Sequence, residues 1–202
     1  MNALAREDLA SLIGSRICHD LISPIGAINN GLELLSMSGQ KIGPELSLIE
    51  ASARNASARI RFFRIAFGAP VGQNVSEHET TSILREISES SRIDIAYLAD
   101  GPQSRADIRM VYLAVMCLET ALAYGGTIKI SQAQGDWSLL GTGTRTIRDD
   151  DLWTDPNDPP ALHSVAPSHV QFVLLPLVVE ETGRVLRISH AANEMRITMS
   201  HG

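Results

Sequence analysis

The sequence predicts an α+β protein in which an N-terminal helical hairpin, residues 1–70, precedes an α/β sandwich domain, residues 73–202. Residues 3–37 and 44–67 carry apolar side chains at alternating spacings of three and four, which is typical of amphipathic helices. Glycine, proline and polar residues at 68–74 then interrupt this pattern. Beyond them, segments of alternating apolar residues predict strands that are interspersed with helices.

The two N-terminal helices carry apolar seams. On the first helix these are Gly14, Ile17, Leu21, Pro24, Ile28, Gly31 and Leu35, and beside them Cys18, Leu21, Ile25, Ile28, Leu32 and Leu35; the second helix carries Leu46, Ile49, Ala53, Ala56, Ile60, Phe63 and Phe67. Residues 37–43 predict a short loop, and Pro44 suits the first position of the second helix. Because two helices cannot close a core alone, we expect a homodimer with a four-helix bundle. The outer face is expected to expose Arg54, Arg59, Arg61 and Arg64.

The second domain alternates helical and strand patterns. We expect a helix at 79–91, a strand in RIDIAYL, a helix at 104–123, a hairpin from TIKIS to SLLGTGTRT turning near 134–136, an irregular stretch at 149–166, a mostly buried helix at 167–182, and a terminal hairpin of VLRISH and EMRITMS. This order of elements predicts helices layered on a sheet.

Composition excludes several classes of function. The net charge of -6, without a basic stripe, argues against nucleic-acid binding. The apolar runs are too short to span a membrane, and the N-terminal residues do not resemble an export signal, so we expect a cytoplasmic protein. Cys18 and Cys117 lie far apart among apolar neighbours and are interpreted as reduced, buried thiols. The spacing of the histidines, cysteines and acidic residues predicts no metal site.

His19 is the candidate reactive residue. At about 100° per residue, it lies opposite Ile28 on the helix, so it is expected to be exposed. Its face is lined mainly by small or polar residues, namely Asp8, Ser15, Ser23, Gly26 and Asn30, with Leu12 and Ile22 as the larger apolar members. An exposed neutral imidazole is a nucleophile that can carry a phosphoryl group without a base to deprotonate it.

The segment SRICHDLISPIGAINNGLELL resembles the phosphoacceptor box of histidine kinases, in which His19, Asp20, Leu21 and Pro24 occur in the same order. The combination of HDL, SP, AI and NGLELL is more similar to the ChpT family of histidine phosphotransferases. This resemblance implies that His19 carries the phosphoryl group and that Asp20 orients or polarises its imidazole. It also implies a docking face that includes Ser15, Ser23, Gly26 and Asn30. A solvated helix residue remains the alternative reading of Asp20.

The second domain resembles the ATPase domain of histidine kinases in a degenerate form. LETALAYGGTIKI aligns by pattern with the helix that bears a metal-binding asparagine in those kinases, but Thr120 stands at the asparagine position. Leu139 stands where an adenine-reading aspartate would precede Gly141 and Gly143, and these glycines fit a hairpin strand better. The resemblance therefore implies that this chain binds no ATP and no other cofactor.

The ChpT resemblance implies a phosphorelay. A phosphoryl group would pass from the receiver aspartate of a hybrid histidine kinase to His19, and then to the receiver aspartates of response regulators, with Mg²⁺ supplied by each receiver. The resemblance suggests cell-cycle or developmental regulation. Two alternatives stay open from the residues: an ATP-using histidine kinase, and a non-catalytic adaptor that binds receivers.

Overall fold

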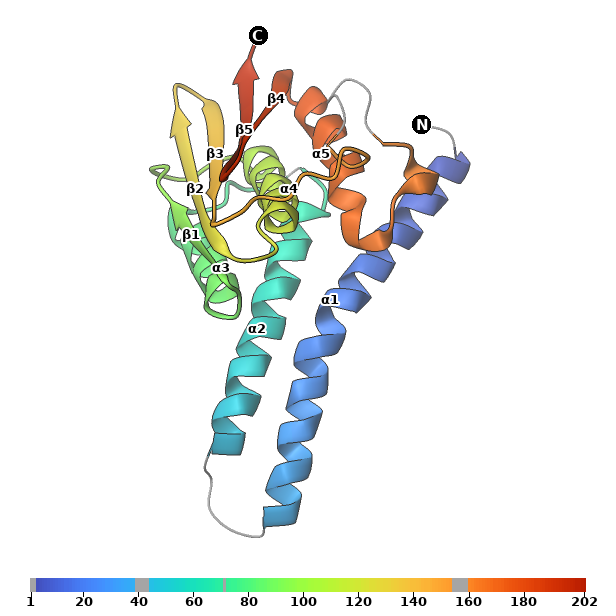
Figure 1. Ribbon diagram of the computed structural model, residues 1–202, viewed down its shortest axis with the longest axis vertical. Helices are drawn as coiled ribbons and strands as arrows, with labels where there is room; N and C mark the ends of the chain where they lie inside the picture. Colours follow the sequence, from blue (N-terminus) through green and yellow to red (C-terminus); the bar gives the residue numbers. More distant parts are fainter. Residues whose placement is uncertain (1–2, 39–43, 71, 154–159) are drawn as a thin grey trace.

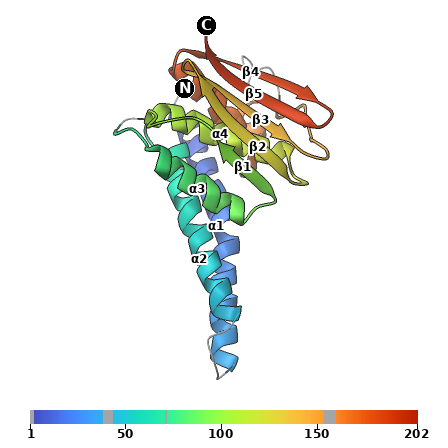
Figure 2. The same cartoon turned by 90° about the vertical axis from the view of Figure 1, so that its left-hand side faces the viewer.

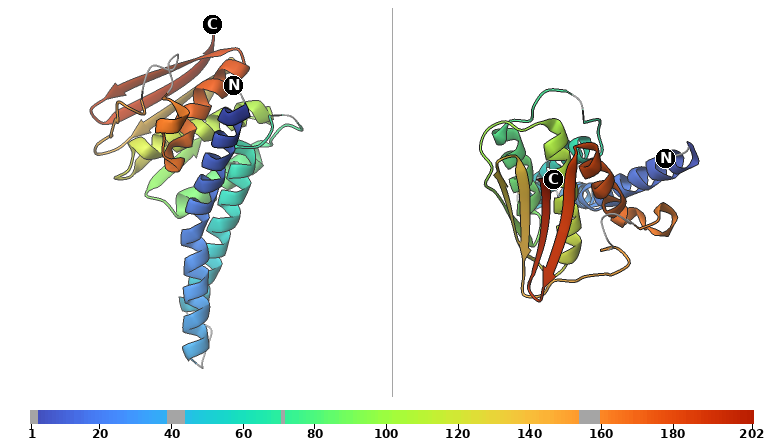
Figure 3. Two further views of the ribbon diagram at one scale, coloured as in Figure 1. Left: turned by 90° about the vertical axis from the view of Figure 1, so that its right-hand side faces the viewer. Right: turned by 90° about the horizontal axis from the view of Figure 1, so that it is seen from above.

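The computed structural model describes residues 3–38, 44–70, 72–153 and 160–202. Helices α1 (Ala3–Ser38) and α2 (Pro44–Ala66) form a hairpin whose loop end projects away from the rest of the molecule (Figures 1 and 3). Both predicted helices are confirmed, and α2 begins at the predicted proline. The predicted loop lies largely outside the described residues. At 1.5 Å per residue, α1 is about 54 Å long, which gives the hairpin its stalk-like shape.

The rest of the chain forms one mixed sheet with helices packed against it (Figures 1 and 2). Its elements are α3 (Glu77–Glu89), β1 (Ile93–Tyr97), α4 (Arg105–Ala121), β2 (Gly126–Ala133), β3 (Asp136–Thr142), the 3-10 turns η1 (Leu162–Ser164) and η2 (Pro167–His169), α5 (Val170–Glu181), β4 (Arg184–Ala191) and β5 (Glu194–His201). The strand order is β1-β2-β3-β5-β4, with β1 and β2 parallel and the other neighbours antiparallel. This arrangement confirms the predicted α+β class.

The sheet buries one of its faces against helices. Along β3 and β5 every second side chain is buried, and α4 and α5 contact the strands. This is the period expected of strands with one covered face. Eleven of the 17 residues of α4 are buried, because the helix lies between the sheet and the hairpin. The helix therefore connects the two parts of the fold.

The predicted β2–β3 turn and the first residue of β2 have backbone conformations that suit glycine. The β2–β3 turn places Gln134 at φ 54° and Gly135 at φ 88°, as in a type I′ hairpin turn. Gly126 has φ 154°, and a Cβ there would lie 2.2 Å from the carbonyl oxygen of Thr142. Only glycine permits this approach of the two backbones.

The C-terminal half of α2 belongs to the core of the sheet domain. Its buried residues are Ala58, Phe62, Phe63, Ile65 and Ala66. The ring of Phe62 stacks on that of Tyr112 in α4, with centroids 4.3 Å apart. The predicted seam of α2 is therefore divided: Phe63 is buried, whereas Ala53 is exposed and Ile60 is 54% exposed. Helix α2 turns one face to the sheet domain and leaves another uncovered.

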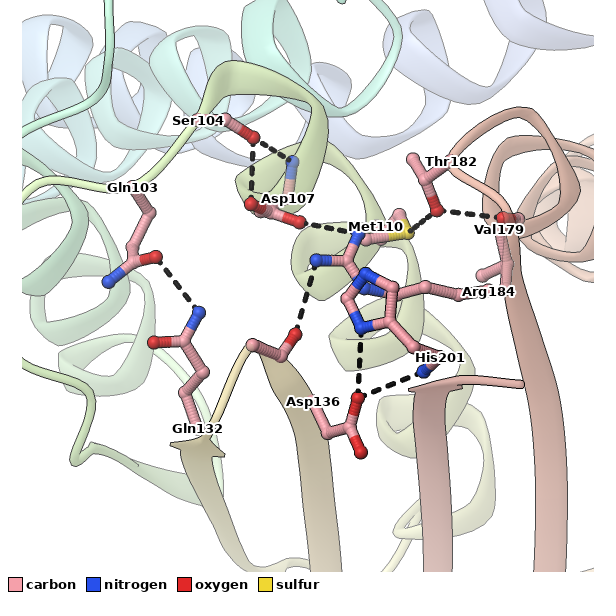
Figure 4. Close-up of polar contacts among 11 residues, drawn as sticks. Gln103, Ser104, Asp107, Met110, Gln132, Asp136, Val179, Thr182, Arg184 and His201 are labelled. Carbon is pink, nitrogen blue, oxygen red and sulfur yellow. Dashed lines mark hydrogen bonds and ion pairs between the residues drawn. The ribbon is translucent and has the colours of Figure 1, made fainter.

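Polar contacts hold the N-terminal end of α4. Arg184 at the start of β4 pairs with Asp107 in the first turn of α4 at 2.8 Å, and it donates to the carbonyl of Gly135 at 3.1 Å (Figure 4). The Ser104 hydroxyl caps α4 by accepting from the backbone N–H of Asp107. These contacts fix the N-terminal end of α4 to the sheet, at the end of the helix that lies away from His19.

Candidate functional site

His19 lies on the surface of α1, and its side chain is 74% exposed. The predicted exposure is confirmed. The imidazole borders a groove between the two helices of the hairpin and the C-terminal end of α3. The groove is lined by His19, Asp20, Ser23, Pro24, Ala27, Ala51, Ser52, Asn55, Arg59, Glu89 and Ser90. A macromolecule that enters this groove therefore contacts both the hairpin and the sheet domain.

Asp20 holds one nitrogen of this imidazole. Its side chain is only 8% exposed, and its Oδ1 lies 3.1 Å from Nδ1 of His19. A carboxylate that pairs with guanidinium groups accepts hydrogen bonds and donates none, so Nδ1 carries the hydrogen and donates it. The second ring nitrogen, Nε2, then keeps its lone pair as a nucleophile. The reading of Asp20 as a solvated residue is wrong.

Two arginines bind the other oxygen of Asp20. Arg16 pairs with Oδ2 at 2.9 Å from one turn earlier on α1, and Arg59 reaches it from α2 at 3.4 Å. The side chain of Asn55 accepts a hydrogen bond from Nε of Arg59 at 3.1 Å, which steadies this arginine. The carboxylate is thus fixed from both helices. A second guanidinium nitrogen of Arg16 donates to the backbone carbonyl of Ser168 in η2.

The expectation that four arginines of α2 face outward is wrong for two of them. Arg59 turns inward to Asp20, and Arg61 pairs with Glu86 of α3. The periodicity of α2 did not indicate which neighbour each face would meet. Arg16 was also missed as a site residue, although its spacing of four from Asp20 is a recognisable helical ion-pair signal.

The predicted docking residues fall at different places on α1. Ser15, Ser23 and Asn30 are exposed and Gly26 is partly buried, but only Ser23 of the four lines the groove beside His19. Cys18 is exposed, so its expected burial is wrong: it lies on the second seam of α1, on which Ile25 and Leu32 are exposed as well. Cys117 is buried as expected, and burial raises the pKa of its thiol.

Thr120 and Leu139, at the two positions that correspond to nucleotide-site residues of the kinases, have protein side chains as neighbours. Gln171 of α5 is fully buried and donates from Nε2 to the hydroxyl of Thr120 at 3.3 Å. Leu139 is fully buried, and a Cβ on Gly141 would lie 3.2 Å from the side chain of Leu118. Gly141 therefore permits close packing of β3 on α4. In the described part of the chain, no three His, Cys, Asp or Glu side chains gather as metal ligands, and no helix is long and apolar enough to cross a membrane.

Comparisons with known proteins identify relatives of the whole chain. Residues 77–194 match the family described as "Histidine phosphotransferase C-terminal domain". The chain is 30% identical over 206 residues to the protein phosphotransferase ChpT of Brucella abortus (strain 2308), with 95% of each chain covered.

Solved structures are similar as well. A bacterial phosphotransferase solved at 1.7 Å has a TM-score of 0.76 and 28% identity, covering 99% of this chain and 98% of that one. The histidine kinase domain of the blue-light activated kinase from Erythrobacter litoralis EL346 has a TM-score of 0.45 at 14% identity, covering 99% of this chain and 94% of that one. The family match covers more than half of the chain, and the Brucella relative is matched over nearly its whole length. This chain therefore belongs to the ChpT-type histidine phosphotransferases of two-component signalling.

Proposed function

We propose that this protein carries a phosphoryl group on His19, accepting it from the receiver aspartate of a hybrid histidine kinase and passing it to receiver aspartates of response regulators. The observation that carries the proposal is the exposed imidazole whose Nδ1 is bound by a buried carboxylate. That arrangement leaves the lone pair on Nε2 of an exposed imidazole. Family membership supports phosphotransfer as the reaction.

The chemistry needs little from this chain beyond orientation. The lone pair of Nε2 forms a bond to phosphorus while the bond between phosphorus and the receiver carboxylate oxygen breaks, and that carboxylate leaves with the electron pair. The imidazole ring becomes a cation that keeps its hydrogen on Nδ1. Asp20 accepts that hydrogen bond and stabilises the positive charge. The reverse sequence delivers the phosphoryl group to a second receiver, and each receiver supplies its own Mg²⁺.

The proposal includes no ATP. In histidine kinases, the position that corresponds to Thr120 holds a metal-binding asparagine. Here the fully buried side chain of Gln171 in α5 binds Thr120 at that position. Leu139 offers no hydrogen-bonding group to an adenine. The sheet domain would serve instead to hold α2 and to border the groove beside His19.

The proposal also includes a homodimer. Several apolar side chains of the hairpin remain exposed in the single chain: Ile22, Ile25, Leu32, Leu34, Leu48 and Ile60. Ile25, Leu32 and Ile60 belong to the predicted seams, so a second copy of the hairpin would cover them in a four-helix bundle. Sedimentation equilibrium of the wild type and of Ile60→Glu tests this, with a dimer expected for the first and a monomer for the second.

Phosphoryl transfer from a radiolabelled receiver tests the main proposal. The purified protein is incubated with a phosphorylated hybrid-kinase receiver and, in parallel, with labelled ATP alone. We expect label only from the receiver and none on His19→Gln, which should still bind the receiver. Label from ATP alone would identify a kinase, and absence of label in both reactions would favour an adaptor.

A further inference from the structure

Glu119 lies in the last turn of α4, next to the residues that hold Asp20. It is partly buried. Two neighbouring cavities are each lined by Arg16, Asp20, Arg59 and Glu119; one opens toward Ser91 and Arg92, and the other is closed by Phe62, Phe63, Ile87 and Met116. The sheet domain thus contributes one acidic side chain to the surroundings of the phosphoacceptor pair.

The carboxyl group of Glu119 faces both arginines without binding either. Among the described residues, no hydrogen bond or ion pair within 4.0 Å involves its side chain, although the two guanidinium groups line the same cavities. Burial raises the pKa of Glu119, while the charges of Arg59 and Arg16 lower it and that of Asp20 raises it. A carboxyl group in this setting exchanges its proton with solvent closer to neutrality than an exposed glutamate does.

We propose that Glu119 is a positioning residue of the phosphotransfer site, which competes with Asp20 for Arg16 and Arg59 and thereby sets how firmly Asp20 holds His19. This inference rests on the proposed role of His19. It assigns the sheet domain a direct electrostatic influence on the histidine, transmitted by one carboxyl group and two guanidinium groups.

Protonation of Glu119 changes the competition. When Glu119 is neutral, it does not compete, and both arginines stay paired with Asp20. When Glu119 is ionised, it attracts the guanidinium groups of Arg16 and Arg59. These groups then neutralise less of the charge of the Asp20 carboxylate. A less neutralised carboxylate stabilises the phosphorylated imidazolium more strongly. Ionisation of Glu119 therefore speeds transfer to His19.

Other charged groups face the same region. Arg16 and Asp20 come from α1, Arg59 from α2, and Arg92 from the connection between α3 and β1. His169 beside α5 interacts electrostatically with Arg16, as does Cys117 of α4. A test must separate the titration of Glu119 from that of these groups and of His19 itself.

The ratio of the wild-type transfer rate to the Glu119→Gln transfer rate isolates the titration of Glu119. Rates of transfer from a phosphorylated receiver are measured for the wild type and for Glu119→Gln between about pH 5.5 and pH 8.5, since groups common to both proteins cancel in the ratio. We expect the ratio of wild-type to variant rate to rise from about one at the acidic end to roughly fivefold at the alkaline end. A ratio that stays constant across this range overturns the proposal.

Two further variants control for structure. Asp107→Asn removes a partly buried carboxylate from the opposite end of α4, where it pairs with Arg184 (Figure 4). The ratio of the wild-type transfer rate to the rate of this variant is expected not to vary with pH. Glu119→Asp keeps the charge and is expected to restore the pH dependence. If Asp107→Asn reproduces the effect of Glu119→Gln, a general loss of stability explains both and the proposal is overturned.

A measurement without phosphoryl transfer separates this inference from the proposed function. The ¹⁵N chemical shifts of the His19 ring are followed through a pH titration of the wild type and of Glu119→Asp. We expect an inflection besides that of the imidazole itself, displaced in the variant. Its absence overturns the inference, whereas failure of the wild type to take label at any pH overturns only the phosphotransfer proposal.

Discussion

Asp20→Asn is the substitution that tests the geometry of the site most directly. The change keeps the size of the side chain but removes its charge and adds a donor. An asparagine NH₂ group can donate to Nδ1 of His19, which would place the ring hydrogen on Nε2, the atom that must attack phosphorus. The variant therefore loses both the electrostatic support of the imidazolium and the reactive tautomer.

The size of the effect follows from the contact with His19. A carboxylate and a cation about 4 Å apart interact by about 4 kcal/mol at an effective dielectric constant of about 20. Because His19 is 74% exposed, solvent screening lowers this to roughly 2 to 3 kcal/mol, the upper range for a hydrogen bond to a charged group. That energy corresponds to a rate of transfer about 30- to 150-fold lower than the wild type. Loss of the charge between Arg16 and Arg59 also destabilises the fold, by about 2 kcal/mol.

Rapid-quench measurement of transfer from a phosphorylated receiver provides the assay, with receiver binding measured separately by calorimetry. Asp8→Asn is the matched control, because Asp8 is an exposed acid on the same helix. This variant is expected to accept the phosphoryl group at the wild-type rate. A rate for Asp20→Asn within about threefold of the wild type would refute the argument that Asp20 fixes the tautomer of His19.

The remaining predictions concern stability. Phe62→Ala is expected to lower the free energy of unfolding by about 3 to 5 kcal/mol, because its ring is buried against Tyr112; urea titration measures this, and a loss below about 1 kcal/mol would contradict it. Gln134→Asn is expected to raise the unfolding free energy by about 0.5 kcal/mol, since Asn-Gly suits the type I′ turn, as thermal unfolding would show. Glu119→Gln is expected to be more stable than the wild type at neutral pH. The raised pKa of Glu119 means that the folded state binds more protons, so wild-type stability falls as pH rises through that pKa, and unfolding at pH 5 and pH 8 compares the two proteins.

Local signals predicted most of the fold. Pro44 marked the start of α2, and the Gln134–Gly135 turn followed from its position between two alternating apolar runs. The exposure of His19 followed from its angle to Ile28 on a single helix. These features depend on neighbours within a few residues, which a periodic pattern records directly.

Contacts between elements were harder to predict. The partnership of Arg59 with Asp20 joins residues 39 positions apart, and it depends on the rotation of α2 relative to α1. The periodicity of each helix defines its own faces but does not fix which face meets which neighbour. For the same reason Cys18 was expected to be buried, and Glu119 was not predicted as a site residue, because its approach to the site depends on how α4 packs against the hairpin.

The double role of Arg16 has a consequence for the dynamics of the chain. One nitrogen of its guanidinium group pairs with Asp20, and the other donates to the carbonyl of Ser168 in a segment built from two turns of three residues each. Such short turns open at a far lower free energy than the buried helix that follows them. Amide hydrogen exchange at His169, whose N–H binds the carbonyl of Ala166, therefore reports how often one anchor of the phosphoacceptor site is released.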